Sequence, residues 1–322
     1  MKKLFIKLAK ILGFEIIDQN QFYSPTLNRE LNEDLSTLNE KSIVLPLGNV
    51  KILRSVKSIL IITRMNTEVE IWDQNKKRLF EQPKIDYSYR SINSLIKSIS
   101  FCQNKYPNIK IKTIIIDDNS KDENLNRIKK LVDNKNIEIV SLNHENYKTL
   151  IKDQKTKETF SNLASLMNSF EIAKDKGEDL IFFVEDDYLH FEPMLEEMVA
   201  SYERIASQLK KDIFMCPSDY PYLYMNNEKT NILIGNKRHW RTINTTLCTF
   251  MTSKKLLNKY WENFKKTCLD RNDPFEKHIN EIYEKEICVS PLKSLSLHLT
   301  NVNSSYGLAP FIDYKKLWDE NK

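Results

Sequence analysis

Apolar residues between positions 56 and 210 form short unbroken runs, separated by stretches in which apolar residues recur at helical spacing. Unbroken runs of this kind are typical of strands that are covered on both faces of a sheet. The predicted strands are 58–63, 112–117, 137–142 and 180–184. The predicted helices are 92–102, 125–132, 160–176 and 193–209. This alternation indicates an α/β fold with a mostly parallel sheet flanked by helices.

The order of the elements changes after residue 210. Strands are predicted at 212–216, 232–235, 243–251, 287–289 and 295–299. Helices are predicted at 254–267 and 274–285. Shorter strands that follow one another without a helix between them favour antiparallel pairing. We therefore expect 211–322 to form a smaller, antiparallel half of the same domain as 56–210.

Residues 1–55 precede the first predicted strand and differ in character. Residues 2–14 predict a short amphipathic helix, with apolar side chains on one face and Lys3, Lys7 and Lys10 on the other. Such a helix either lies in a membrane interface or docks on its own domain or a partner. The lysines interrupt what would otherwise resemble a signal peptide. The polar stretch 18–55 predicts a linker with a short helix near 28–40.

Composition excludes several classes of protein. With only 5 glycines and no GxGxxG or GxxxxGK[ST] pattern, neither a Rossmann dinucleotide site nor a P-loop is expected. The net charge of +5 comes from dispersed lysines without a nucleic-acid-binding motif, so we expect no nucleic-acid partner. The 5 cysteines are scattered and lack a CxxC pair, which favours reduced thiols and a cytoplasmic location, peripheral to the inner face of the membrane if residues 2–14 bind lipid.

Three adjacent acids, Glu185, Asp186 and Asp187, follow the predicted strand 180–184. Ligands of open α/β sheets bind beyond the carboxyl ends of the strands, which is where these acids would lie. Carboxylates this close repel one another, and a hard divalent cation such as Mg²⁺ would offset their charge. The alternative is an acidic strand end that is solvated in a loop.

Polar side chains also follow two neighbouring predicted strands. Thr63 and Arg64 end the first strand, and Asp117 and Asp118 begin an Asp-Asp-Asn-Ser element after the second. This element, followed about 67 residues later by the acidic cluster, resembles the two hallmark motifs of the GT-A glycosyltransferases, especially those of the family-2 type. The resemblance covers roughly 56–210 and implies a GT-A-type sheet with an acceptor-side region formed by 211–322.

The resemblance implies a nucleoside-diphosphate-sugar donor and a hydroxyl acceptor on a glycan or lipid-linked glycan. In such enzymes the second acid of the first motif contacts the nucleotide, which would be Asp118, next to Asp117. Thr63 and Arg64 resemble the residues at the first strand end that meet the nucleotide, although Arg64 could equally form a surface ion pair.

The acidic motif of these enzymes binds Mn²⁺ or Mg²⁺ at the donor diphosphate. Asp187 is the first ligand candidate, with Glu185 or Asp186 assisting through water or the ribose. A histidine late in the chain supplies a further ligand in some members, and His298 resembles it in position. The alternative is that His298, which lies in an apolar strand, is a structural residue of the core.

Inverting members of the group need a carboxylate that removes a proton from the acceptor hydroxyl, and we expect inversion here. Asp273 and Glu276 flank Pro274 where a helix is predicted to start, which resembles the position of that base. Ordinary helix capping by the same two residues is the structural alternative. The processive-synthase signature QxxRW is absent, which disfavours a polymerising enzyme.

Two other functions are compatible with the same pattern. A nucleotidyltransferase of related topology is disfavoured because the chain lacks a Gly-rich phosphate loop near its first strand. A non-catalytic carbohydrate-binding or assembly protein on a transferase fold is disfavoured by the retention of all three acids at 185–187.

Overall fold

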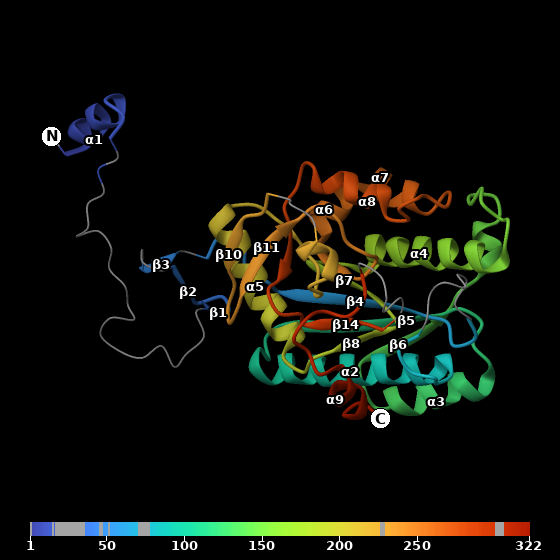
Figure 1. Cartoon of the computed structure of the whole chain (residues 1–322). Coiled ribbons are helices and arrows are strands. Elements are labelled where there is room, and N and C mark those ends of the chain that lie inside the picture. Colours follow the sequence, from blue (N-terminus) through green and yellow to red (C-terminus); the bar gives the residue numbers. More distant parts are fainter. Residues whose placement is uncertain are drawn as a thin grey trace.

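The protein is built around one nine-stranded sheet (Figure 1). A computed structural model describes residues 2–14, 16, 36–44, 48–50, 52–69, 78–225, 229–299 and 306–322. The strand order is β10-β11-β13-β9-β12-β7-β4-β5-β6. Helices cover both faces of the sheet, so the predicted α/β architecture is confirmed.

One half of the sheet is parallel. It consists of β7 (Leu180–Glu185), β4 (Ser58–Met65), β5 (Lys110–Asp117) and β6 (Ile137–Ser141). Along β4, successive side chains alternate between the two faces, yet Ile59, Leu60, Ile61 and Ile62 are all buried. This two-sided burial is the reason that the sequence shows unbroken apolar runs.

Different helices cover the two faces of the parallel half. Four helices follow its strands: α2 (Lys84–Lys105), α3 (Asp122–Val132), α4 (Lys157–Lys176) and α5 (Met194–Leu209). Residues of α4 share a core with Leu60 and Ile62, whereas residues of α2 and α5 share a core with Ile59 and Ile61. In Figure 1, α4 accordingly lies above the sheet and α2 and α3 lie below it.

The other half of the sheet comes from the last third of the chain. Its strands are β9 (Phe214–Met215), β10 (Ile232–Ile234), β11 (His239–Ile243), β12 (Phe250–Ser253) and β13 (Cys288–Pro291). β12 pairs antiparallel with β7 and so joins the two halves into one sheet. The predicted antiparallel region is therefore present, with one parallel pair, β13 and β9, inside it.

The prediction of a single strand at 243–251 is wrong. β11 ends at Ile243 and β12 begins at Phe250. Between them, Thr246 turns to α8 (Lys277–Tyr283), where its backbone N–H donates to Asn280 Oδ1 at 3.1 Å and its hydroxyl lies 2.9 Å from the Tyr283 hydroxyl. These contacts with a distant helix replace strand pairing.

The predicted helix 254–267 is divided into α6 (Lys254–Lys259) and α7 (Trp261–Thr267). The helix predicted at 92–102 is longer, because α2 begins at Lys84, directly after Pro83, and ends at Lys105. Residues 70–77, between β4 and α2, lie outside the described residues.

Smaller elements complete the fold. Two short strands, β8 (Tyr188–His190) and β14 (Ser296–His298), pair as a separate sheet beside the main one. The amphipathic helix is present as α1 (Lys2–Ile11). Three short strands follow it: β1 (Ser36–Thr37), β2 (Lys41–Val44) and β3 (Gly48–Val50). The predicted helix near 28–40 is not found at 36–40, and 28–35 lies outside the described residues. Across the part of the chain that the structure describes, no helix has the length and apolar character needed to cross a bilayer.

The last helix, α9 (Tyr314–Asp319), packs against the start of α2. The Trp318 ring stacks on Phe80 with centroids 4.2 Å apart and contacts Tyr87 at 4.7 Å. The guanidinium of Arg90 lies over the same indole at 4.2 Å. The end of the chain therefore holds the segment that leads into α2.

Candidate functional site

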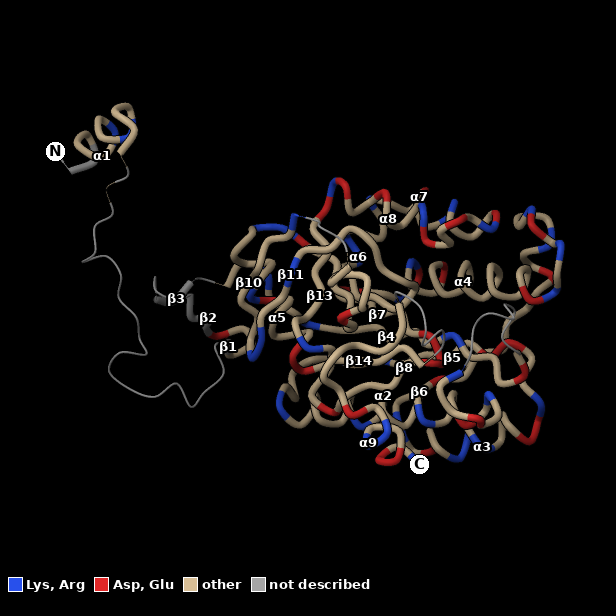
Figure 2. The backbone as a smooth tube through the Cα atoms, in the orientation of Figure 1, with Lys and Arg blue, Asp and Glu red and all other residues tan. Residues whose placement is uncertain are grey.

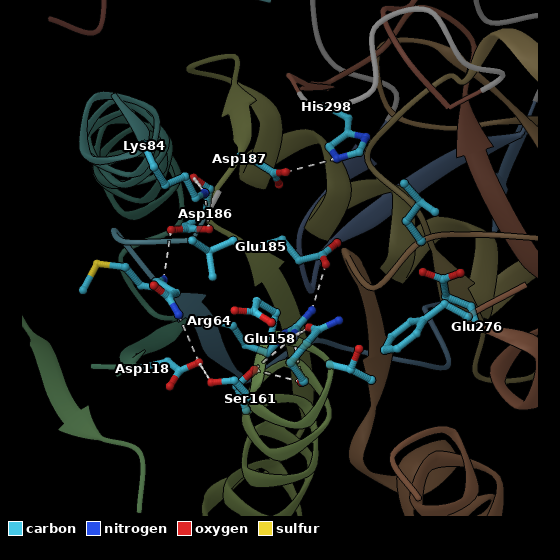
Figure 3. Close-up of a pocket in the computed structure, with 18 of the residues that line it drawn as sticks. Arg64, Lys84, Asp118, Glu158, Ser161, Glu185, Asp186, Asp187, Glu276 and His298 are labelled. Carbon is cyan, nitrogen blue, oxygen red and sulfur yellow. Dashed lines mark hydrogen bonds and ion pairs between the residues drawn. The ribbon is translucent and has the colours of Figure 1, made fainter. Parts of the chain in front are cut away.

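A cavity of about 390 Å³ lies at the carboxyl ends of the parallel strands (Figure 3). The lining of the cavity includes Arg64 of strand β4 and Asp118, the residue that follows β5. The end of β7 contributes 185–187, β14 contributes His298, and the start of α8 contributes Glu276. The structure thus brings together most of the site residues predicted from the sequence.

Asp118 is held by three side chains on its cavity wall. Its Oδ1 lies 2.8 Å from His144 Nε2, and its Oδ2 accepts hydrogen bonds from the Ser161 hydroxyl and from Asn66 Nδ2, the latter at 3.2 Å. The aspartate is only 4% exposed. Its carboxylate is therefore fixed in place without any ligand.

Two of the predicted nucleotide-contacting residues do not line the cavity. Asp117 is buried beside Asp118, accepts hydrogen bonds from Ser120, and has its pKa raised by burial. Thr63 is fully buried within β4. In each predicted pair the second residue, Arg64 or Asp118, lines the cavity, and the first is buried.

Arg64 forms a buried ion pair at the cavity wall. Its Nη2 lies 2.8 Å from Glu185 Oε1, while its Nη1 donates to Asn162 Oδ1 at 2.7 Å. Burial opposes the charge of Arg64, but the pKa of the guanidinium is raised overall, because the negative charges around it, that of Glu185 first and that of Asp186 among the others, together outweigh burial. Burial raises the pKa of Glu185, and Arg64 opposes that rise. The first acid of the cluster thus serves chiefly as the partner of Arg64.

Asp186, the second acid, is tied to α2. Its Oδ1 accepts from Lys84 Nζ at 2.6 Å, and its Oδ2 accepts from the Ser88 hydroxyl at 2.5 Å and the Asn66 backbone N–H at 3.2 Å. Both carboxylate oxygens are engaged by the protein itself. Asp186 therefore joins the loop after β7 to the first turn of α2.

Asp187, the third acid, pairs with His298. The carboxylate Oδ2 lies 3.3 Å from the imidazole Nε2, since the pairing of β8 with β14 places the two residues side by side (Figure 3). Burial lowers the pKa of His298, but the charge and hydrogen bond of Asp187, together with the charge of Glu185 and the Tyr306 carbonyl, outweigh burial and raise the pKa overall. The imidazole also stacks on Tyr188, with centroids 4.8 Å apart.

The Asp187–His298 pair has the chemistry of a divalent-metal site. A carboxylate oxygen and an imidazole nitrogen suit Mn²⁺, and Mg²⁺ commonly takes one or two carboxylates with substrate phosphates and water as the other ligands. No group of three His, Cys, Asp or Glu side chains suited to a metal ion occurs among the described residues. The pair alone could therefore supply two ligands to an ion, one carboxylate oxygen and one imidazole nitrogen.

Glu276 lies across the cavity from Lys84 and Asp186 (Figure 3). Burial, aided by the charge of Glu185, raises its pKa from 4.5 to about 7. Its Oε1 is the acceptor for the Cys248 thiol, 3.7 Å away. By contrast, Asp273 is exposed and does not line the cavity. Since α8 begins at Lys277, the alternative of an Asp273 cap with Glu276 inside the helix does not hold.

Glu276→Gln is expected to make the protein's stability less dependent on pH. A carboxyl group whose pKa is raised by folding costs nothing below pH 4.5, where it is protonated in both states, and destabilises the folded state as pH rises through about 7. The variant should therefore gain up to about 3 kcal/mol relative to the parent between pH 5 and pH 8. Urea unfolding at both pH values measures this. The exposed Glu262→Gln variant should show no such trend, and a parallel pH profile for Glu276→Gln would contradict the assignment.

Several residues of the site were not predicted, namely Asn66, Lys84, His144, Ser161 and Asn162. His144 follows β6, so the rule that pointed to the other strand ends would also have pointed to it. Helix α4 begins at Lys157, before the predicted start at 160, because Thr156 is its N-cap and accepts from the Thr159 N–H at 3.1 Å. That earlier start of α4 frees Ser161 to reach Asp118.

No protein-family model matches the chain, and no curated protein matches it. Among solved structures it is similar to S. aureus TarS 1–349, at 12% identity and a TM-score of 0.43, over 74% of this chain and 59% of that chain. It is similar to an active-site mutant of LgtC at 12% identity and a TM-score of 0.37, over 71% of each chain.

It is also similar to a UDP-glucose pyrophosphorylase complexed with UDP-glucose, at 8% identity and a TM-score of 0.40, over 83% of this chain and 97% of that chain. A structure of the galactosyltransferase LgtC in complex with donor and acceptor sugar analogs is also similar, at 10% identity and a TM-score of 0.33, over 70% of each chain. The chain spans less than two thirds of TarS 1–349. Likenesses at this level carry no argument about function, which rests on the site.

Proposed function

We propose that this protein is a metal-dependent, inverting glycosyltransferase. It moves a sugar from a nucleoside-diphosphate sugar to a hydroxyl group of a glycan or lipid-linked glycan. The supporting observation is that one cavity holds a fixed aspartate, an aspartate–histidine pair and, across from them, a carboxyl group whose pKa lies near neutrality.

The donor would lie along the ends of the parallel strands. Asp118, held by His144 and Ser161, is positioned to accept hydrogen bonds from the base or ribose. Asp187 and His298 would hold Mn²⁺ or Mg²⁺ at the diphosphate. When bound, such an ion acts as a Lewis acid and offsets the charge that develops on the leaving nucleoside diphosphate.

Glu276 would act as the general base. A base works best when its pKa lies near the working pH, and burial gives Glu276 a pKa of about 7. Its ionised carboxylate would take the proton of the acceptor hydroxyl as that oxygen attacks the anomeric carbon. Because Glu276 and the Asp187–His298 pair belong to different walls, attack from the face opposite the diphosphate would invert the configuration.

A thermal-shift titration tests the donor assignment. A nucleotide sugar with Mn²⁺ at a hundred times its Kd should stabilise the parent by about 2.7 kcal/mol, and EDTA should remove most of the effect. In Asp118→Ala the shift should shrink because the nucleotide contact is lost, whereas the exposed Asp133→Ala variant should behave as the parent. If no nucleotide sugar shifts the transition with or without Mn²⁺, the proposal is wrong.

Reaction products separate this function from its alternatives. A glycosyltransferase releases a nucleoside diphosphate, and a nucleotidyltransferase releases pyrophosphate. Donor binding without any turnover in the presence of a panel of acceptors would favour a carbohydrate-binding or assembly role.

A further inference from the structure

Helix α1 carries an exposed apolar face. Four of its large apolar side chains are 51–75% exposed, namely Leu4, Phe5, Leu8 and Ile11, and Leu12, the next residue, is 71% exposed. Phe14, just after the helix, is 68% exposed. Figure 1 shows α1 apart from the sheet and its covering helices. An apolar face of this size on so short a helix requires a covering surface.

The same helix is uniformly basic. Lysines occupy positions 2, 3, 7 and 10, and no acidic residue precedes Glu15. Figure 2 shows basic residues and no acidic residue on α1, whereas both charges are interspersed over the rest of the protein. We therefore expect the partner surface of α1 to offer apolar groups to its apolar face and negative charges to its lysines.

We propose that α1 lies in the plane of an anionic phospholipid surface. At 10 residues it is about 15 Å long, half the thickness of a bilayer's hydrocarbon core, so it is suited to the interface and not to a crossing. Its leucine, isoleucine and phenylalanine side chains would enter the acyl region. The lysines would extend to the phosphate groups.

The short length of α1 favours a helix that is covered by lipid over one that is exposed to water. Isolated helices shorter than about 12–15 residues are marginal in water, so α1 gains its stability from whatever covers its apolar face. A second copy of α1 would bring its Lys7 and Lys10 close to those of the first copy beside an apolar seam, and these lysines would repel one another. Anionic lipid instead neutralises the lysines as it covers the leucines.

Vesicle sedimentation of the full chain tests this proposal, which is independent of the proposed function. Vesicles of phosphatidylcholine with phosphatidylglycerol should bind the parent at least about tenfold more tightly than vesicles of phosphatidylcholine alone, and added salt should weaken that binding. Phe5→Glu and the double variant Lys7→Glu/Lys10→Glu should each lose about tenfold. Their matched controls, Phe311→Glu at a 95% exposed phenylalanine and Lys129→Glu/Lys130→Glu on α3, should bind as the parent.

Three outcomes would overturn the inference. The first is an absence of binding to the anionic vesicles. The second is equal binding by the parent and Phe5→Glu. The third is a lipid-free dimer, seen by analytical ultracentrifugation, that dissociates in Phe5→Glu, because the apolar face would then be covered by a second copy. Circular dichroism of each variant should match the parent, since the altered side chains are exposed.

Discussion

Asp187→Asn is expected to lower kcat/KM for a nucleotide-sugar donor by about 10²–10³-fold. The carboxylate of Asp187 is the one acid of the cluster that faces His298, at 3.3 Å, and its removal leaves the imidazole as the only strong ligand of the pair. Steady-state kinetics across a Mn²⁺ titration would measure the loss, together with a higher Mn²⁺ concentration for half-maximal rate.

The neighbouring Asp186 provides a matched control. Asp186→Asn removes the ion pair with Lys84, so its main effect should be lower stability, with the Mn²⁺ dependence of the remaining activity unchanged. Full activity in Asp187→Asn with an unaltered Mn²⁺ dependence would rule out the assigned ligand. The reverse pattern in the two variants would assign the metal to Asp186.

Glu276→Gln is expected to lower kcat by about 10²–10⁴-fold while donor binding stays as in the parent. Glutamine has nearly the same shape but cannot accept the acceptor's proton. In the parent, the rate should rise with pH through about 7, because the base must be ionised, and the variant should lack this rise. Single-turnover rates at several pH values would measure both effects.

Asp273 offers the direct comparison. Because it is exposed and outside the cavity lining, Asp273→Asn should retain a rate close to that of the parent and the same pH profile. A large loss in Asp273→Asn beside an active Glu276→Gln would exchange the two roles.

The sequence was sufficient to predict the parallel half of the fold and its ligand edge. Strands β4, β5 and β7 each contain an unbroken apolar run (59–62, 114–116 and 180–184) because these residues are covered on both faces of the sheet, and such a run is a local property of the chain. The side chains at their ends meet because parallel strands end at one edge. Arg64, Asp118 and Asp187 line the cavity for this reason.

The different partners of the three adjacent acids could not be predicted from the same pattern. It depends on residues about a hundred positions away: Arg64 for Glu185, Lys84 for Asp186 and His298 for Asp187. The same limit applies to 243–251, where β-forming residues are interrupted by contacts of Thr246 with α8. Local pattern indicates the ends of the buried parallel strands, but not which distant partner contacts each side chain.

The packing of α9 bears on how the protein should be handled. Trp318 lies between Phe80 and Arg90, and the backbone carbonyls of Glu320 and Asn321 accept hydrogen bonds from α2. An affinity tag fused directly after Lys322 would press on the helix that supplies Lys84 to the cavity. A tag before Met1 would instead extend the basic helix. A reporter is therefore best joined after Lys322 through a flexible glycine–serine spacer. The spacer preserves the contacts of α9 with α2 and leaves α1 unchanged.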